Sequence, residues 1–217
     1  MIDKLKVAVL VENHPYDIVG FQEMLDSFTD CTYYVQPVDL FVQDDLNKKN
    51  YDTVLWYNIN WDPPKEDGFL RKYLENEIGE TSQGIVIIHH ALLNFQNWDL
   101  YTRICGLKER GANVGFKYTQ NETVTQHILD PNHPVTGGIS DFSVIDETYR
   151  IGEPEEEGNS LLISTDNKTS MHYLAWTRQY RNSRVFSYAS GHDGRVYSNE
   201  NYRRIVNQAL RWTACRI

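Results

Sequence analysis

The stretch Gly84-Ile85-Val86-Ile87-Ile88-His89-His90-Ala91 decides the fold. Its four consecutive branched aliphatic residues predict a short strand that is buried on both faces, as the inner strands of a parallel sheet are. Two histidines follow at once, where such a strand would end. We therefore expect a central strand over residues 84–88 with imidazole groups at its carboxyl end.

Similar strands and amphipathic helices alternate along the rest of the chain. Apolar runs predict the strands, and apolar residues at helical spacing predict the helices. The last helical stripe follows Ser198, which we expect to be its N-cap. The expected strands span residues 5–11, 32–35, 53–57, 84–88 and 184–189, and the expected helices span residues 18–28, 69–78, 98–105 and 202–210.

This alternation predicts an α/β fold with a doubly wound parallel sheet. The segment from about Val124 to Arg178 has a different pattern, because short alternating runs are separated there by Pro, Gly and acidic turns. It predicts a β-rich insertion or edge in the C-terminal half. No internal repeat or linker interrupts the chain, so we interpret residues 1–217 as a single domain.

The composition narrows the class of ligand and the location. The 21 Lys and Arg against 30 Asp and Glu give a net charge of −9. This charge argues against nucleic acid or an anionic membrane surface as the main partner and favours a small neutral or polar ligand. No apolar run approaches the roughly 20 residues that cross a bilayer, and the first residues lack the pattern of a signal peptide. We therefore expect a cytoplasmic protein.

The three cysteines, Cys31, Cys105 and Cys215, are far apart and form no C-x-x-C motif. Their number and spacing suggest neither a disulfide framework nor a thiolate zinc site. We expect them to be buried free thiols.

Polar side chains concentrate where the expected core strands end. Four of the seven histidines, His14, His89, His90 and His192, follow such strands, and ligands of open α/β sheets bind beyond the carboxyl ends of the strands. Imidazole there can act as a general base, ligate a metal or donate hydrogen bonds to sugar hydroxyls. Adjacent residues of a strand point to opposite faces, so His89 and His90 share one site only if the strand has already ended. The candidates for ligand binding are His14, Asn60, Trp61, His90 and Trp98.

Asp146-Glu147 places two carboxylates inside an otherwise β-like run. A carboxylate there can orient an imidazole, act as acid or base, or ligate a metal, and a solvated pair on an edge strand is the alternative. Neither H-x-x-E-H nor H-E-x-x-H occurs, so the spacing of the residues does not support a metal site. A divalent metal is still left open as a cofactor. The glycine-rich loops that bind dinucleotides or nucleotide phosphates are absent.

Several blocks of the chain resemble the ThuA-like (trehalose utilisation) family. They keep the family's order from about residue 84 to the C-terminus, and the final Gly191-His192-Asp193 before the last helix is the most specific of them. The resemblance implies a flavodoxin-like fold of the class I glutamine amidotransferase-like superfamily. The blocks are residues 84–91 followed by Trp98 and Tyr101, then residues 133–138, 146–149, 175–177 and 184–193.

Amidotransferases of that superfamily carry a cysteine in the turn after the central strand. This chain has His89-His90-Ala91 there, so we expect no glutaminase activity through a thioester. The chain also departs from the family after Gly106, where it reads Leu107-Lys108-Glu109-Arg110-Gly111 in place of an aromatic residue and a histidine. The resemblance implies site roles for His89, Glu147, Tyr149, His192 and Asp193.

The family's members accompany sugar oxidoreductases in disaccharide breakdown, so the resemblance implies a 3-keto disaccharide or related glycoside as the ligand. Our hypothesis is acid–base chemistry in which His89 or Glu147 removes the proton next to the ketone, His192 acts as the acid, and Asp193 orients His192. The alternatives are a non-catalytic sugar-binding or regulatory domain and a scaffold for a partner enzyme. The pattern also leaves open a homo-oligomer through the β-rich edge or the last helix.

Overall fold

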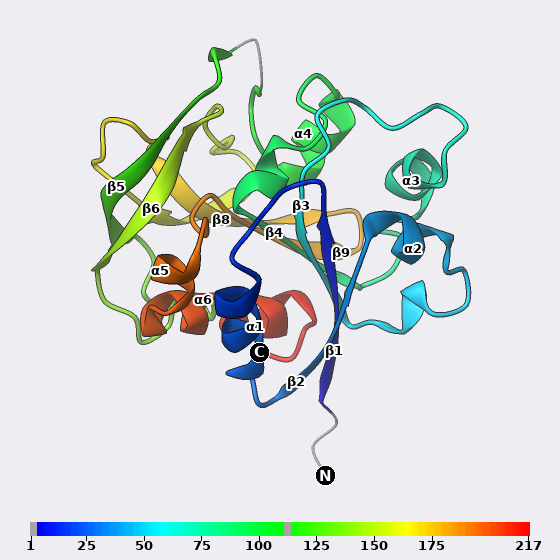
Figure 1. Ribbon diagram of the computed structural model, residues 1–217, viewed down its shortest axis with the longest axis horizontal. Coiled ribbons are helices and arrows are strands. Elements are labelled where there is room, and N and C mark those ends of the chain that lie inside the picture. Colours follow the sequence, from blue (N-terminus) through cyan, green and yellow to red (C-terminus); the bar gives the residue numbers. More distant parts are fainter. Residues whose placement is uncertain (1–3, 111–113) are drawn as a thin grey trace.

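The computed structural model describes residues 4–110 and 114–217. Within these ranges nine strands form one sheet in the order β2-β1-β3-β4-β9-β8-β7-β5-β6 (Figure 1). Residues 1–3, which belong to the segment expected to lack a signal peptide, lie outside the described residues, and so does Gly111. The strands are β1 (Leu5–Glu12), β2 (Cys31–Gln36), β3 (Thr53–Asn58), β4 (Gly84–Ile88), β5 (Lys117–Ile128), β6 (Phe142–Arg150), β7 (Asn159–Ser164), β8 (Tyr173–Tyr180) and β9 (Ser183–Tyr188). The helices are α1 (Ile18–Asp26), α2 (Val38–Gln43), α3 (Phe69–Lys72), α4 (Asp99–Cys105), α5 (Gly194–Tyr197) and α6 (Glu200–Thr213), with short 3₁₀ segments η1 (Lys48–Asn50) and η3 (His89–Leu93) and a π-helical turn η2 (Tyr73–Glu77).

The first four strands and β9 form the parallel part of the sheet. β1 lies between β2 and β3, and β4 lies between β3 and β9, with every pairing parallel. β3 and β4 are buried along their whole length, as unbroken apolar runs predict. The expected α/β fold with a parallel sheet is thereby confirmed.

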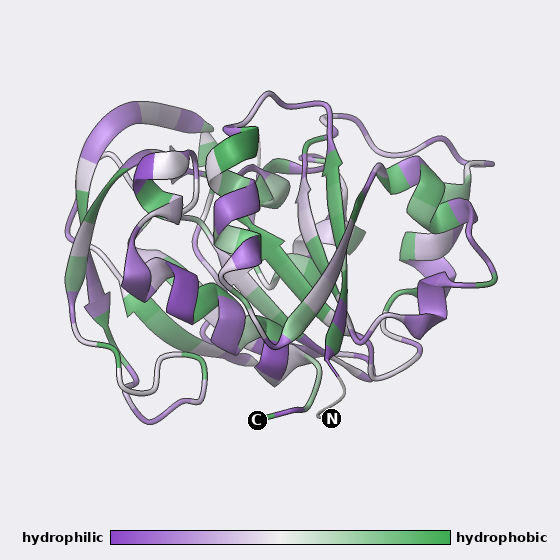
Figure 2. Ribbon diagram, turned by 60° about the horizontal axis from the view of Figure 1, so that its bottom comes forward, coloured by the Kyte–Doolittle hydropathy of each residue, from purple (hydrophilic) through white to green (hydrophobic). Residues whose placement is uncertain are grey.

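Helices cover both faces of this parallel part (Figures 1 and 2). On one face Tyr57 of β3 packs against Phe21 of α1 and Tyr197 of α5. The preceding residue, Trp56, points to the opposite face and packs against Tyr73 of η2. Alternation along the strand therefore builds one apolar layer on each side of the sheet. No helix in the described ranges is long and apolar enough to cross a bilayer.

The remaining strands extend the sheet in an antiparallel manner. β8 pairs with β9, β7 with β8, β5 with β7 and β6 with β5. They come from the segment whose pattern predicts a β-rich insertion or edge, and they continue the same sheet on one side (Figure 1). This extension curls so that Glu147 of β6 meets His192, which follows β9.

The C-terminal helices differ from expectation in where they begin. Asn199 caps α6, because its side chain accepts hydrogen bonds from the N–H groups of Asn201 and Tyr202, so the assignment of Ser198 as N-cap is wrong. Ser198 instead ends the one-turn helix α5. A four-residue helix is too short to leave a periodic pattern in the sequence, which is why α5 was not expected.

Candidate functional site

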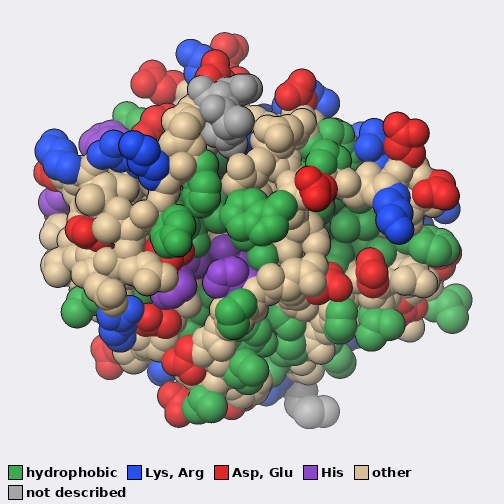
Figure 3. All heavy atoms as spheres, turned by 45° about the horizontal axis from the view of Figure 1, so that its top comes forward, with side chains coloured by type: hydrophobic (Ala, Val, Ile, Leu, Met, Phe, Trp, Pro, Cys, Tyr) green, Lys and Arg blue, Asp and Glu red, His purple; other side chains and the backbone are tan. Residues whose placement is uncertain are grey.

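Four histidines gather at the carboxyl ends of β1, β4 and β9. Figure 3 shows histidine side chains on this face of the molecule, beside hydrophobic ones, although His89 and His90 themselves are buried. The ring of His14 stacks on that of His90 with 4.3 Å between centroids. The ring centroids of His89 and His192 are 5.3 Å apart, and those of His14 and His192 are 6.4 Å apart. The clustering expected from the strand ends is therefore present in the structure.

His89 occupies the turn directly after β4 and is completely buried. Its φ of +52° is uncommon for a residue with a side chain and costs about 1–3 kcal/mol. The strand has already ended there, so the two neighbouring histidines need not follow strand alternation. His89 Nδ1 lies 2.9 Å from the carbonyl oxygen of Ala189. Because a carbonyl only accepts, Nδ1 carries a proton, and Nε2 is the ring atom that meets the groups on the other side.

Three polar groups surround that Nε2 atom. The Tyr149 hydroxyl lies 2.8 Å away and donates to it, His192 Nδ1 lies at 3.2 Å, and Glu147 Oε1 at 3.7 Å. Glu147 Oε1 is also 3.7 Å from His192 Nδ1. His89, Glu147 and His192 each contribute one atom with metal-ligand chemistry to a compact triangle, in which all three atoms lie within 4.8 Å of one another.

The Glu147 carboxylate is the negative charge of this group. Burial by itself would raise the pKa of Glu147, but His89, Tyr149 and Gln120 around the carboxylate outweigh burial and lower that pKa to about 2. Gln120 donates to Glu147 Oε2 over 3.1 Å. Glu147 is therefore ionised at neutral pH. Burial also raises the pKa of Tyr149, so its hydroxyl stays protonated and can donate.

Two members of the triangle, Glu147 and His192, line a pocket of about 420 Å³, and the buried His89 lies behind them, outside the lining. Trp61 and Tyr118, which are 52% and 58% exposed, stand at the pocket with Phe116, whose ring centroid is 6.1 Å from that of Trp61 and 6.2 Å from that of Tyr118. Aromatic side chains therefore form one wall, and the polar groups form the inner end. The lining residues are His14, Pro15, Ile59, Trp61, Leu93, Phe116, Tyr118, Gln120, Glu147, Tyr149 and His192.

His90 does not line this pocket but packs behind it. Its Nε2 donates to the Tyr57 carbonyl over 3.1 Å, and its ring carries the stacked His14. Burial, with the neighbouring histidines, lowers the pKa of His90 to about 2, so the ring is neutral. Burial likewise lowers the pKa of His14. Of these two candidates for ligand binding, the structure brings His14 to the pocket and places His90 beneath it.

Besides His90 and the buried His89, three candidates lie outside the pocket lining. Asn60 accepts a hydrogen bond of 2.6 Å from Asn13, and Trp98 lies against Arg71 in a separate surface groove. The carboxylate of Asp193 caps α5 and accepts hydrogen bonds from Arg195. Its expected hydrogen bond to the His192 ring is not formed among the described residues, because Arg195 already occupies both carboxylate oxygens.

The segment that departs from the family pattern has a structural role. The Arg110 guanidinium is buried and donates to the carbonyls of Leu92, Asn94 and Phe95. It also donates to Thr102 Oγ1. Arg110 therefore fixes the segment that follows His89 and His90, and Leu93 of that segment lines the pocket.

Sequence reasoning missed four residues that build the site. Phe116, just before β5, and Tyr118 and Gln120, in its first residues, line the pocket. Their spacing of two residues is the signal that could have found them, since alternate residues of a strand share a face. Asp146, considered only as the neighbour of Glu147, is buried and binds the loop that carries His192.

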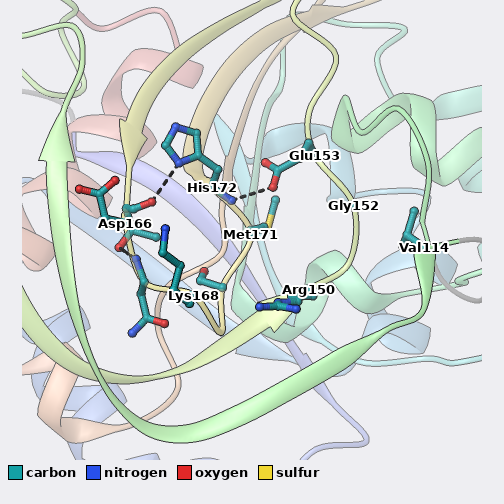
Figure 4. Close-up of a pocket in the computed structure, with 11 residues that line it drawn as sticks. Val114, Arg150, Gly152, Glu153, Asp166, Lys168, Met171 and His172 are labelled. Atoms are coloured by element: carbon teal, nitrogen blue, oxygen red, sulfur yellow. Dashed lines mark hydrogen bonds between the residues drawn. The ribbon is translucent and has the colours of Figure 1, made fainter.

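A second cavity, of about 390 Å³, lies at the β7–β8 turn (Figure 4). Arg150, Lys168 and Met171 are among the residues that line it, and Glu153 accepts a 2.7 Å hydrogen bond from the His172 N–H. None of the four clustered histidines lines it. The two cavities have similar volumes, so the chemistry of the lining identifies the histidine pocket as the candidate site.

The model of the ThuA family, described as trehalose utilisation, matches residues 16–213. No curated protein matches the chain. A ThuA-like protein of Parabacteroides merdae has a similar structure, with a TM-score of 0.76 and 18% identity over 97% of this chain and 90% of that one. A cytoplasmic protein of Salmonella typhimurium follows with a TM-score of 0.68 and 14% identity over 96% and 99% of the chains. A glutamine amidotransferase of Thermotoga maritima has a TM-score of 0.55 and 8% identity over 96% and 98%. These structures share the fold, and the match to the family model shows that the chain belongs to the ThuA (trehalose utilisation) family.

Proposed function

We propose that the chain processes a neutral sugar, a 3-keto disaccharide or a related glycoside, at the histidine pocket. The observation that carries this proposal is the meeting of His89, Glu147 and His192 at an aromatic-walled pocket, which Glu147 and His192 line and behind which His89 lies. A sugar ring stacks its apolar face on aromatic side chains and presents its hydroxyls to polar groups. The family's description, trehalose utilisation, supports a carbohydrate ligand.

The proposed chemistry is acid–base catalysis on the oxidised ring. The proton at C2, next to the C3 ketone, is acidic, and His89 Nε2 accepts it in place of the hydrogen bond from the Tyr149 hydroxyl. The electron pair left at C2 forms a C1=C2 double bond as the bond from C1 to the glycosidic oxygen breaks, and His192 donates a proton to that oxygen. Glu147, with a pKa of about 2, is a weak base at neutral pH and stabilises the charged imidazoles instead.

The same three residues also fit a divalent metal such as zinc. A point equally distant from His89 Nε2, His192 Nδ1 and Glu147 Oε1 lies about 2.1 Å from each atom, which is the length of zinc bonds to nitrogen and oxygen. The hydrogen bond from His89 Nδ1 to a backbone carbonyl is the usual support of a metal-bound histidine. Such an ion would supply Lewis-acid polarisation of the sugar's carbonyl oxygen.

We propose further that the chain has no glutaminase activity. His89 stands in the turn after β4, and none of the cysteines lines the pocket that the described residues form. Burial raises the pKa of Cys105 to about 11, which removes its thiolate at neutral pH. A cytoplasmic location belongs to the proposal too, supported by the Salmonella relative, while a homo-oligomer stays a prediction from the sequence.

The first test is the turnover of 3-keto-trehalose and of unoxidised trehalose by the wild type, His89→Ala and His192→Ala. We expect turnover of the oxidised sugar only, with a loss of about 100-fold or more in each variant. Trp98→Ala is the matched control, because Trp98 lies outside the pocket. Full turnover by both histidine variants would refute the acid–base assignment.

Other outcomes of the same experiment favour the alternative functions. Sugar binding that survives in the double histidine variant, without turnover in either form, indicates a non-catalytic binding domain. Failure to bind any sugar, together with stable co-purification with another protein, indicates a scaffold.

Elemental analysis of protein purified without chelator distinguishes the two forms of the chemistry. A stoichiometric metal that is lost in His89→Ala makes the three residues ligands and moves the reaction to Lewis-acid catalysis. Protein that holds no metal but is stabilised by the oxidised sugar supports proton transfer by the same residues.

A further inference from the structure

Asp146 lies next to Glu147 but takes no part in the chemistry proposed above. Its side chain is buried, with 2% exposed. Its Oδ1 accepts hydrogen bonds from the N–H groups of Glu147 at 2.9 Å and His192 at 3.0 Å. Its Oδ2 accepts from the Gly191 N–H at 2.9 Å and from the Ser190 hydroxyl. Each oxygen thus receives two donors, which is the full accepting capacity of a carboxylate.

These four hydrogen bonds connect the two halves of the site. Asp146 and Glu147 are consecutive residues of β6, and they hold the same loop in two ways. The Glu147 carboxylate lies 3.7 Å from the His192 ring, while the Asp146 carboxylate binds the His192 backbone. The position of the His192 ring relative to Glu147 and His89 therefore depends on Asp146.

The carbonyl group of His192 is hydrogen-bonded as well as its N–H group. Its carbonyl accepts hydrogen bonds from the hydroxyls of Tyr197 at 3.0 Å and Tyr57 at 3.3 Å. Behind Asp146, Ser190 accepts a 3.0 Å hydrogen bond from Gln126, which is itself fully buried. Asp146 thus connects a buried hydrogen-bond network, which includes Ser190 and Gln126, to the backbone of Glu147 and His192.

We infer that Asp146 is a positioning residue, which places the His192 ring against His89 and Glu147. This inference rests on the proposed function of those three residues, whether they transfer protons or hold a metal. Asparagine has nearly the same shape as aspartate, but its NH₂ group would face the N–H groups of Glu147 and His192 in one orientation and the Gly191 N–H in the other, where the Ser190 hydroxyl can turn and accept. Asp146→Asn must therefore lose at least one of the hydrogen bonds from the loop backbone, that of His192 or that of Gly191, and release one side of the loop.

The experiment compares wild type and Asp146→Asn by three measurements on the full chain. Amide exchange of Gly191 and His192 reports the loop, nuclear Overhauser contacts between the His89 and His192 rings report the site, and competition with a chromogenic chelator gives the Zn²⁺ affinity. We expect exchange at least 10-fold faster, loss of the ring contact, and Zn²⁺ affinity 10- to 100-fold weaker.

Two control variants separate positioning from general stability. Val144→Ala removes buried methyl groups from the same strand, so it lowers the melting temperature without touching the loop and should retain the ring contact and the Zn²⁺ affinity. Ser190→Ala removes one donor to Asp146 and should change the affinity less than threefold.

An unchanged ring contact in a folded Asp146→Asn protein overturns the inference, whatever its activity. Equal losses of ring contact and affinity in Val144→Ala overturn it as well, because the effect would then follow stability alone. If the wild type binds neither Zn²⁺ nor the oxidised sugar, the proposed function fails, and the ring contact still decides the role of Asp146.

Discussion

Gly191, the residue before His192, should tolerate no side chain. Its φ is +131°, and a Cβ there would overlap the Tyr202 hydroxyl oxygen and lie 3.0 Å from Ile88 Cγ2. The backbone conformation costs about 1–3 kcal/mol for alanine. Displacing Tyr202 also breaks its hydrogen bond to the Ser190 carbonyl, which adds about 1 kcal/mol. We therefore expect Gly191→Ala to lower the free energy of unfolding by about 2–4 kcal/mol.

Urea denaturation measures this change, and Gly158→Ala is the matched control. Gly158 also has a positive φ, of +80°, but a Cβ there would meet nothing within 4 Å. It carries the backbone cost alone, so the difference between the two variants measures the packing beneath the His192 loop. If Gly191→Ala destabilises the protein no more than Gly158→Ala, within about 0.5 kcal/mol, the close packing of the loop against Tyr202 is not what holds it.

Three further predictions concern acid stability, ligand affinity and the segment after η3. Burial lowers the pKa of His133 in the folded protein, and the Nδ1 atom of its neutral ring accepts a hydrogen bond from the Val135 N–H. The contribution of His133 to the free energy of unfolding should therefore be full above its unfolded pKa of about 6.5 and be lost as the pH falls toward its lower pKa in the folded protein. His133→Phe should lose less free energy of unfolding than the wild type between pH 7 and pH 5, as measured by urea denaturation at both pH values. An equal loss in the two proteins would contradict the assignment. Trp61→Ala should weaken binding of the oxidised sugar about 3- to 10-fold by calorimetry, whereas an equal loss in Trp98→Ala would disprove the location of the aromatic wall. Arg110→Met should lower the free energy of unfolding by about 2–4 kcal/mol, because the carbonyls of Leu92, Asn94 and Phe95 lose their donor; a loss below about 0.5 kcal/mol would show that water replaces the guanidinium.

The strands of the parallel part were predictable because local pattern reflects their surroundings. A strand covered on both faces must be apolar at every position, so β4 was evident from Ile85 to Ile88. The helix α6 was evident for a similar reason, since its stripe from Tyr202 to Leu210 packs on the sheet. The short α5 was not, because one helical turn contains no period to detect.

The candidate site was predictable only in part. The residue pattern places His89 and His192 at the ends of core strands, which share their carboxyl edge in a parallel sheet. Only the structure shows that these two strands, β4 and β9, are neighbours. The residue pattern alone could not decide between His89 and His90, because that choice depends on where the strand ends and on the positive φ of His89, and the family resemblance was what favoured His89. The resemblance implies a site role for Asp193, which our hypothesis made the partner of His192, but Arg195 binds the same carboxylate.

The sequence by itself determined the α/β class, the parallel core and the edge of the sheet at which histidines collect, since these follow from the period and burial of single elements. Only the tertiary structure decided which groups meet His89. Glu147 and Tyr149 are about sixty residues away in the chain and reach it because β5 and β6 curl over the strand ends. Contacts between distant segments depend on sheet curvature and packing, and no local pattern of residues encodes these.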